Sequence, residues 1–63
     1  MPKISLRAAR VNAGLTQEQA AKELGVSRST LKNWESGKSY PKQPAINAIC
    51  ELYKVQYDVI FFG

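Results

Sequence analysis

The stretch that decides the fold is residues 16–35, TQEQAAKELGVSRSTLKNWE. Gln19 follows Thr16 by three residues, so the Thr16 hydroxyl can accept a hydrogen bond from the backbone N–H of Gln19 while the Gln19 side chain reaches back. Small or apolar residues then recur on one face at helical spacing, at Ala20, Ala21 and Leu24. The pattern predicts a helix that begins at Thr16 and ends at Gly25, because glycine readily takes the left-handed conformation that ends a helix.

A second helix is expected within a few residues of the first. Ser27 is a second N-cap, and Val26 before it can pack on Leu31 as a hydrophobic staple. The spacing buries Leu31 and Trp34, with Thr30 beside them. The outward face carries the polar side chains Arg28, Ser29, Lys32, Asn33 and Ser36. Two helices joined by so tight a turn form a helix-turn-helix, and the second helix of this motif usually enters the major groove of DNA.

The same residues resemble the lambdoid phage repressor and Cro family (XRE-like), and the similarity runs through most of the chain. The matching motifs are Gly14-Leu15-Thr16-Gln17, Ala21, Gly25-Val26-Ser27 and Trp34-Glu35-Ser36-Gly37-Lys38, with no gap from Leu15 to Lys38. The chain departs from the family pattern near Tyr53-Lys54, where the join to the last helix looks longer than in close members. The resemblance implies a lambda-repressor-like DNA-binding domain.

The sequence before the motif predicts a first helix. Ser5 can cap this helix, and Gly14 closes it. The residues expected on its inner face are Leu6, Ala9, Arg10 and Ala13.

The sequence after the motif favours two more helices. Pro41 and Pro44 bound an irregular loop that begins at Gly37, and Pro44 is favourable in the first turn of a fourth helix. The apolar residues of that helix are Ile46, Ile49, Cys50 and Leu52 or Tyr53. A fifth, short helix is expected from Gln56 through Phe62. Its inward residues are Val55, Val59, Ile60 and Phe62. We therefore predict an all-α, compact five-helix globule that forms a single domain over residues 1–63.

Composition excludes several classes of protein. The chain has 63 residues with one cysteine and no histidine, so neither a disulfide framework nor a zinc site is expected. No nucleophile, base or carboxylate pair has a catalytic context, so we expect neither an enzyme nor a cofactor. No apolar run reaches ~18 residues and the N-terminus lacks a signal-peptide pattern, which favours a cytoplasmic protein without a membrane partner. The net charge of +4 is compatible with binding a polyanion.

The outward face of the second helix of the motif holds the candidate base-reading residues Arg28, Ser29, Lys32 and Asn33. Arginine suits the O6 and N7 acceptors of guanine, and asparagine suits N6 and N7 of adenine. Lys32 can reach either a base or a phosphate. The plain alternative is a solvated helix face, which is the usual fate of charged helical residues.

Other polar residues are candidates for contacts to the DNA backbone. Gln17 lies at the start of the motif's first helix, and the resemblance implies that it binds phosphate there. The loop after the second helix resembles the family's phosphate-contacting segment. The backbone candidates, taken together, are Gln17, Ser36, Lys38, Ser39, Tyr40, Lys42 and Gln43.

Arg10 lies partly on the buried face of the first expected helix, where an unpaired charge is costly. It therefore needs a partner. In the family an arginine of the first helix pairs with the glutamate that follows the core residue of the recognition helix. Those positions are Arg10 and Glu35 here, so the resemblance implies a structural ion pair.

Two classes of function remain open on the sequence. The first is a sequence-specific transcriptional regulator, expected to be a repressor, either complete or the N-terminal domain of a longer repressor. It is expected to bind a pseudo-palindromic operator in double-stranded DNA as a homodimer, and a monomer is compatible with the free chain. The expected dimer contacts lie near Pro44 and along residues 57–62. The second is an interaction module, antitoxin-like or adaptor-like, whose exposed helix face binds a protein.

Overall fold

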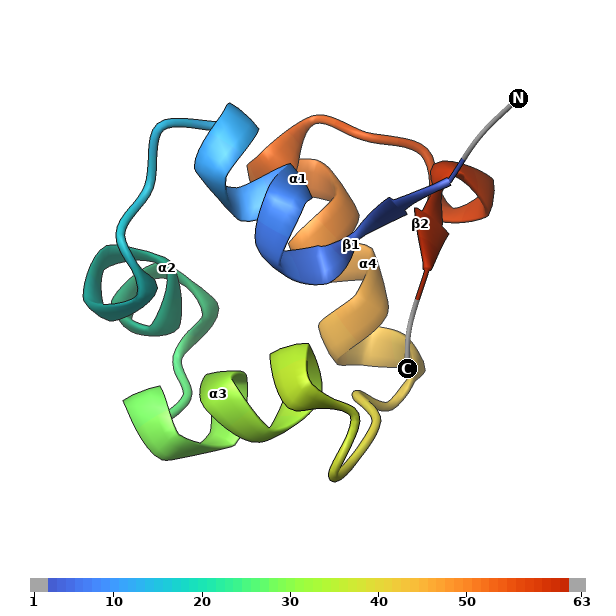
Figure 1. Ribbon diagram of the computed structural model, residues 1–63. Helices are drawn as coiled ribbons and strands as arrows, with labels where there is room; N and C mark the ends of the chain where they lie inside the picture. Colours follow the sequence, from blue (N-terminus) through green and yellow to red (C-terminus); the bar gives the residue numbers. More distant parts are fainter. Residues whose placement is uncertain (1–2, 62–63) are drawn as a thin grey trace.

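The computed structural model describes residues 3–61, in which four α-helices enclose a small core (Figure 1). The elements are β1 (Ile4–Ser5), α1 (Leu6–Asn12), α2 (Gln17–Leu24), α3 (Arg28–Ser36), α4 (Gln43–Tyr53), the 3-10 turn η1 (Tyr57–Val59) and β2 (Ile60–Phe61). In Figure 1, α2 lies at the left and α3 along the bottom, while α1 lies above α3 and α4 lies to the right of α1 and partly behind it. The two helices of the motif are thus backed by the other two.

The ends of α2 are those that the sequence predicts. Thr16 Oγ1 accepts from the backbone N–H of Gln19 at 3.1 Å, and the Thr16 N–H donates to Gln19 Oε1 at 2.9 Å. Gly25 ends the helix in the left-handed conformation, with φ of 73°. Ser27 then caps α3 by accepting from the Thr30 N–H at 3.0 Å. Caps on both sides of the turn fix where each helix begins and ends, and hence the angle at which α3 leaves α2.

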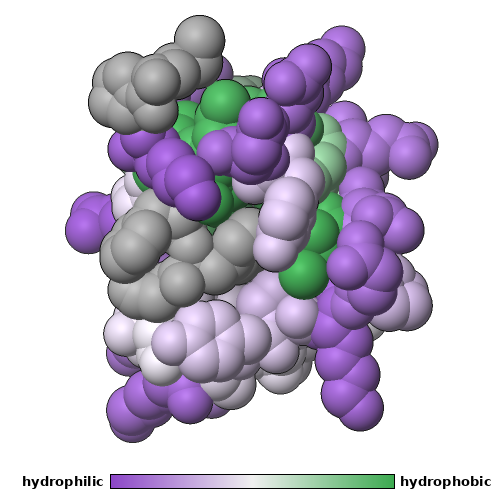
Figure 2. All heavy atoms as spheres, turned by 90° about the vertical axis from the view of Figure 1, so that its right-hand side faces the viewer, coloured by the Kyte–Doolittle hydropathy of each residue, from purple (hydrophilic) through white to green (hydrophobic). Residues whose placement is uncertain are grey.

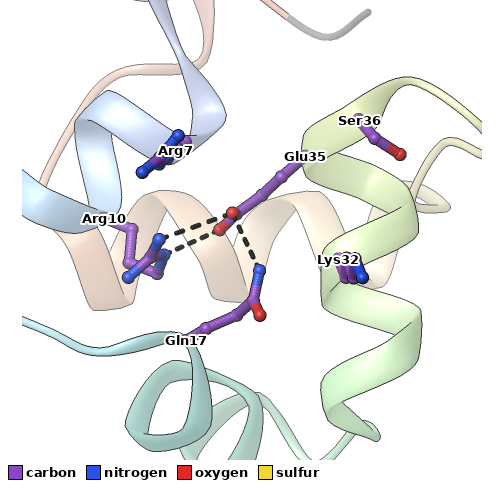
Figure 3. A pocket seen from close by; sticks show the side chains of 6 residues that line it. All are labelled: Arg7, Arg10, Gln17, Lys32, Glu35 and Ser36. Carbon is purple, nitrogen blue, oxygen red and sulfur yellow. Dashed lines mark hydrogen bonds and ion pairs between the residues drawn. The ribbon is translucent and has the colours of Figure 1, made fainter.

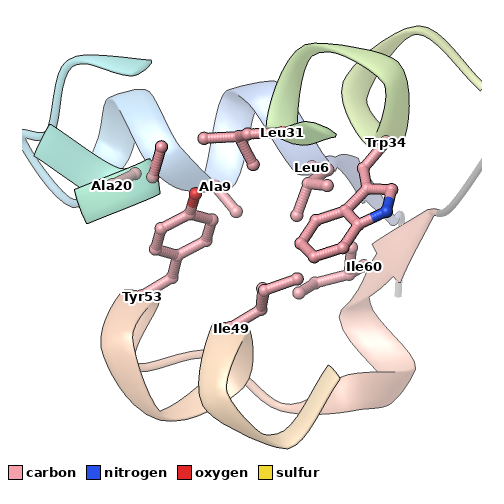
Figure 4. Packing of buried hydrophobic residues seen from close by; sticks show 9 residues of the cluster. Leu6, Ala9, Ala20, Leu31, Trp34, Ile49, Tyr53 and Ile60 are labelled. Carbon is pink, nitrogen blue, oxygen red and sulfur yellow. The ribbon is translucent and has the colours of Figure 1, made fainter. Parts of the chain in front are cut away.

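The core lies where α1, α3, α4 and β2 meet (Figure 4). Its buried members are Leu6, Ala9, Ala20, Ala21, Leu31, Trp34, Ile49, Tyr53 and Ile60. Leu31 and Trp34 are the two buried residues of α3, as predicted. α2 contributes only Ala20 and Ala21, and side chains this small let it approach α3 and α4 closely.

The prediction of a fifth helix is wrong. After α4, the residues from 55 onward form the three-residue 3-10 turn η1 and then β2, which pairs in parallel with β1 through Ile4 with Ile60 and Ser5 with Phe61. So short a helix is marginal in water, whereas the β-branched Ile60 suits a strand once Ile4 lies beside it. Strands of two residues carry no alternation by which a sequence could reveal them. Ile60 is buried as expected, and Phe62 lies outside the described residues.

Two smaller expectations also need correction. Ala13 is exposed, because α1 ends at Asn12 and Ala13 is its C-cap; the half-buried Leu15 packs against the core instead. Gln43 belongs to α4 and not to the loop, and its side-chain amide donates to Asn47 Oδ1 at 2.9 Å.

The side of the molecule that carries the strand pair has a mixed surface. Figure 2 shows this face, on which hydrophobic residues gather in the upper half between hydrophilic side chains. The exposed large hydrophobic residues among those described are Val11, Tyr40 and Tyr57. This face lies to the side of α3, away from the outward surface of the motif.

Candidate nucleic-acid interface

α3 separates its buried and outward residues along opposite faces. Arg28, Ser29, Lys32 and Ser36 are exposed, whereas Asn33 is half-buried. The backbone carbonyl of Asn33 accepts from the Ser36 hydroxyl at 3.2 Å and from the N–H of Lys38 at 3.0 Å. These bonds bind the start of the following loop to the last turn of α3. The predicted base-reading residues therefore come from one helix, with Asn33 at the edge of its exposed face.

A shallow hollow of about 330 Å³ lies between α3 and the start of α2. Gln17 from α2 and Arg28, Ser29 and Lys32 from α3 line it. The fold thus brings together Gln17, a predicted phosphate contact, and three of the four predicted base-reading residues. A surface of this kind offers positive charge and hydrogen-bond donors side by side, which suits a nucleic-acid backbone and its adjacent bases.

The loop from Gly37 to Lys42 leaves the C-terminal end of α3. Gly37 adopts a left-handed conformation with φ of 84°, which an L side chain disfavours. Lys38, Ser39, Tyr40 and Lys42 are all exposed, while Pro41 is buried and anchors the loop. The loop candidates therefore lie on the surface beside α3, apart from Gln17.

Arg10 and Glu35 form an ion pair that joins α1 to α3 (Figure 3). Arg10 Nε donates to Glu35 Oε2 at 2.8 Å, and Arg10 Nη1 donates to the carbonyl of Leu15 at 2.9 Å. The two side chains are only 10% and 7% exposed. This is the pair that the family resemblance implied, and its burial means that each charge depends on the other.

Gln17 is the third member of this network. Its side-chain Nε2 donates to Glu35 Oε1 at 3.2 Å, so both carboxylate oxygens of Glu35 have donors. Sequence reasoning assigned Gln17 to phosphate alone and missed this contact, because nothing local signals a bond between residues so far apart in the chain. It also missed Arg7, an exposed residue of α1 that faces the same network from the other side.

Tyr53 lies close to the ion pair from the side of the core. Its hydroxyl is buried and has no hydrogen-bond partner among the described residues. Burial raises the pKa of Tyr53 to about 12; the nearby Glu35 carboxylate adds to the increase and Arg10 opposes it. Burial also raises the pKa of the half-buried Cys50 thiol, which favours its neutral form.

The described residues show no other kind of site. Within residues 3–61, no three His, Cys, Asp or Glu side chains lie where they could hold a metal ion together. In the same part of the chain, every helix is too short or too polar to cross a membrane.

Comparison with known proteins places the chain in a family. Residues 6–60 match the helix-turn-helix family model, so the chain belongs to the helix-turn-helix family. It is also 40% identical over 58 residues to the HTH-type transcriptional activator BcrR of Enterococcus faecalis. That alignment covers 92% of this chain but only 28% of the relative, so the chain spans little more than a quarter of that protein. No solved structure matches the chain.

Proposed function

We propose that residues 1–63 act as a sequence-specific DNA-binding unit of a transcriptional regulator, with α3 inserted into the major groove. The observation that supports this most is the division of α3, which buries Leu31 and Trp34 and turns Arg28, Ser29 and Lys32 outward. Membership of the helix-turn-helix family and the similarity to a transcriptional activator favour the same function. Such a protein acts in the cytoplasm, where the DNA of a bacterial or phage-infected cell lies.

We assign the contacts to DNA in two groups. Arg28, Ser29, Lys32 and Asn33 are proposed to reach base edges, because they lie on or beside the outward face of α3. The proposed backbone contacts are Gln17, Ser36, Lys38, Ser39, Tyr40, Lys42 and Gln43. Since the Gln17 side chain already donates to Glu35, its free backbone N–H at the start of α2 is the better donor for a phosphate.

Selection of bound duplexes from a random DNA library tests the proposal, because it reports specificity and symmetry together. On the selected duplex, Arg28→Ala and Asn33→Ala should each lose about 1–3 kcal/mol of binding free energy, with little loss on random DNA. Lys38→Ala, by contrast, should weaken binding to both DNAs alike. Equal losses on both DNAs for Arg28→Ala would contradict base reading. A chain that shifts no duplex at low salt would favour the protein-interaction module instead.

We further propose that the regulator binds a pseudo-palindromic operator as a homodimer, since one α3 spans only a few base pairs. Repression stays a prediction, because the enterococcal relative is named as an activator. A reporter gene carrying the selected operator, measured with and without the regulator, gives the sign of regulation directly.

A further inference from the structure

A second hollow, of about 380 Å³, opens over the Arg10–Glu35 pair between α1, α2 and α3 (Figure 3). Its lining residues are Arg7, Arg10, Gln17, Lys32, Glu35 and Ser36. Arg7 enters from α1 and Lys32 from α3, so the hollow has a basic side chain on two of its walls. It also adjoins the smaller hollow on α3, because Gln17 and Lys32 line both.

The charges in this hollow do not cancel. Arg10 is matched by Glu35, whose two carboxylate oxygens are already occupied by Arg10 and Gln17. Arg7 and Lys32 are exposed, and within residues 3–61 no carboxylate lies at ion-pair distance from either. Two positive charges therefore face a concave surface whose only acid is neutralised. Such a surface attracts an anion and would repel a cation.

The ion pair connects the two walls of the hollow, because Arg10 belongs to α1 and Glu35 to α3. Arg10 follows Arg7 by three residues on α1, and Glu35 follows Lys32 by three residues on α3, so each exposed cation is the helical neighbour of one member of the buried pair. Because the pair joins α1 to α3, it holds together the two helices that carry Arg7 and Lys32 on opposite walls of the hollow. The Ser36 hydroxyl already donates to the Asn33 carbonyl, so any contact of Ser36 with the DNA backbone is assigned to a different phosphate from the one in this hollow.

We propose that this hollow seats one phosphate of the DNA backbone in each half-site, held between Arg7 and Lys32. The inference rests on the proposed function and sharpens it in two ways. It adds Arg7, a residue of α1 outside the helix-turn-helix, to the interface. It also assigns Lys32 to a phosphate, leaving Arg28 and Asn33 as the main readers of base edges.

The test uses the selected duplex, about 20 base pairs long, with single phosphates replaced in turn by neutral methylphosphonates at symmetric positions. Arg7→Gln and Lys32→Gln each remove one exposed charge, and Lys22→Gln on α2 is the matched control because Lys22 is exposed and lines neither hollow. Several methylphosphonate positions should weaken the wild type, because other residues are also proposed to contact the backbone, and one of these positions should be the phosphate held by Arg7 and Lys32. Neutralising that phosphate should lower the affinity of Arg7→Gln or Lys32→Gln little further, while the affinity of Lys22→Gln should fall as much as that of the wild type.

Salt dependence gives a second, independent measurement. Arg7→Gln and Lys32→Gln should each lower the slope of log affinity against log salt by about 0.9 per subunit, on specific and random DNA alike. If the wild type binds but Arg7→Gln behaves like Lys22→Gln, this inference is wrong and the proposed function stands. If Arg7→Gln and Lys32→Gln became insensitive to methylphosphonates at two different positions, the two residues would not bind the same phosphate and the inference would also be wrong. If the wild type binds no duplex, both proposals fail.

Discussion

The Arg10–Glu35 pair is the residue-level contact on which the motif most depends. Both side chains are almost fully buried. Arg10→Met alone therefore leaves the Glu35 carboxylate without its cation, and Glu35→Gln alone leaves the Arg10 guanidinium without its anion. Each should lower the free energy of unfolding by about 3–5 kcal/mol, a large share of the stability of so small a chain. A double-mutant cycle in chemical unfolding should show strong coupling. Additive effects of the two changes would contradict a coupled pair.

Tyr53 offers the opposite case, a buried hydroxyl without a partner among the described residues. Tyr53→Phe removes that group and keeps the ring, so the free energy of unfolding should rise by about 1 kcal/mol. The raised pKa, about 12 in the fold, means that the folded chain keeps the phenol proton longer than the unfolded chain does. Below the unfolded pKa of about 10, the phenol is protonated in both states and the free energy of unfolding does not depend on its ionisation. As the pH rises from about 10 toward 12, only the unfolded chain loses the proton, so the free energy of unfolding falls.

Unfolding measured from neutral pH into that alkaline range should show a shallower loss of stability for Tyr53→Phe than for the wild type. Tyr40→Phe is the matched control, because Tyr40 is 64% exposed. A Tyr53 variant that is clearly less stable at neutral pH would indicate that the hydroxyl has a partner, such as a bound water, in solution.

At the scale of the element, the turn between α2 and α3 sets the direction of α3. A Cβ at Gly25 would meet nothing within 4 Å, so the cost of Gly25→Ala comes from the backbone, which has φ of 73°. We expect a loss of about 1–2 kcal/mol in the free energy of unfolding. Gly25→Asn should lose less, since asparagine tolerates this conformation. Equal losses of the two variants in thermal unfolding would contradict backbone conformation as the cause.

At the scale of the whole molecule, the proposed homodimer would present two α3 helices to one side of the duplex. Half-site centres should then lie about 10–10.5 base pairs apart. Inserting about five base pairs between them turns one half-site to the opposite side and should abolish cooperative binding in a footprinting titration. A matched insertion of a full helical turn should restore part of it. A single asymmetric footprint that tolerates the shorter insertion would contradict the dimer.

Sequence by itself determined the helix-turn-helix motif. The helix ends depend on contacts within a few residues, so they can be predicted from the sequence alone. These local signals are the capping box at Thr16, the glycine at position 25 and the Ser27 cap. The burial of Leu31 and Trp34 followed from helical period alone. The pairing of Arg10 with Glu35 came from family resemblance, since no spacing rule links residues on separate helices.

Only the tertiary structure decided the conformation of residues 57–61 and what surrounds the ion pair. Ile60 is a strand residue because Ile4 lies beside it, and a segment of such mixed propensity adopts whichever conformation its neighbours stabilise. The bond from Gln17 to Glu35 and the position of Arg7 opposite Lys32 arise in the same way. Local hydrogen bonds and periodicity are encoded within a helical turn, whereas contacts between distant segments exist only once the helices have packed.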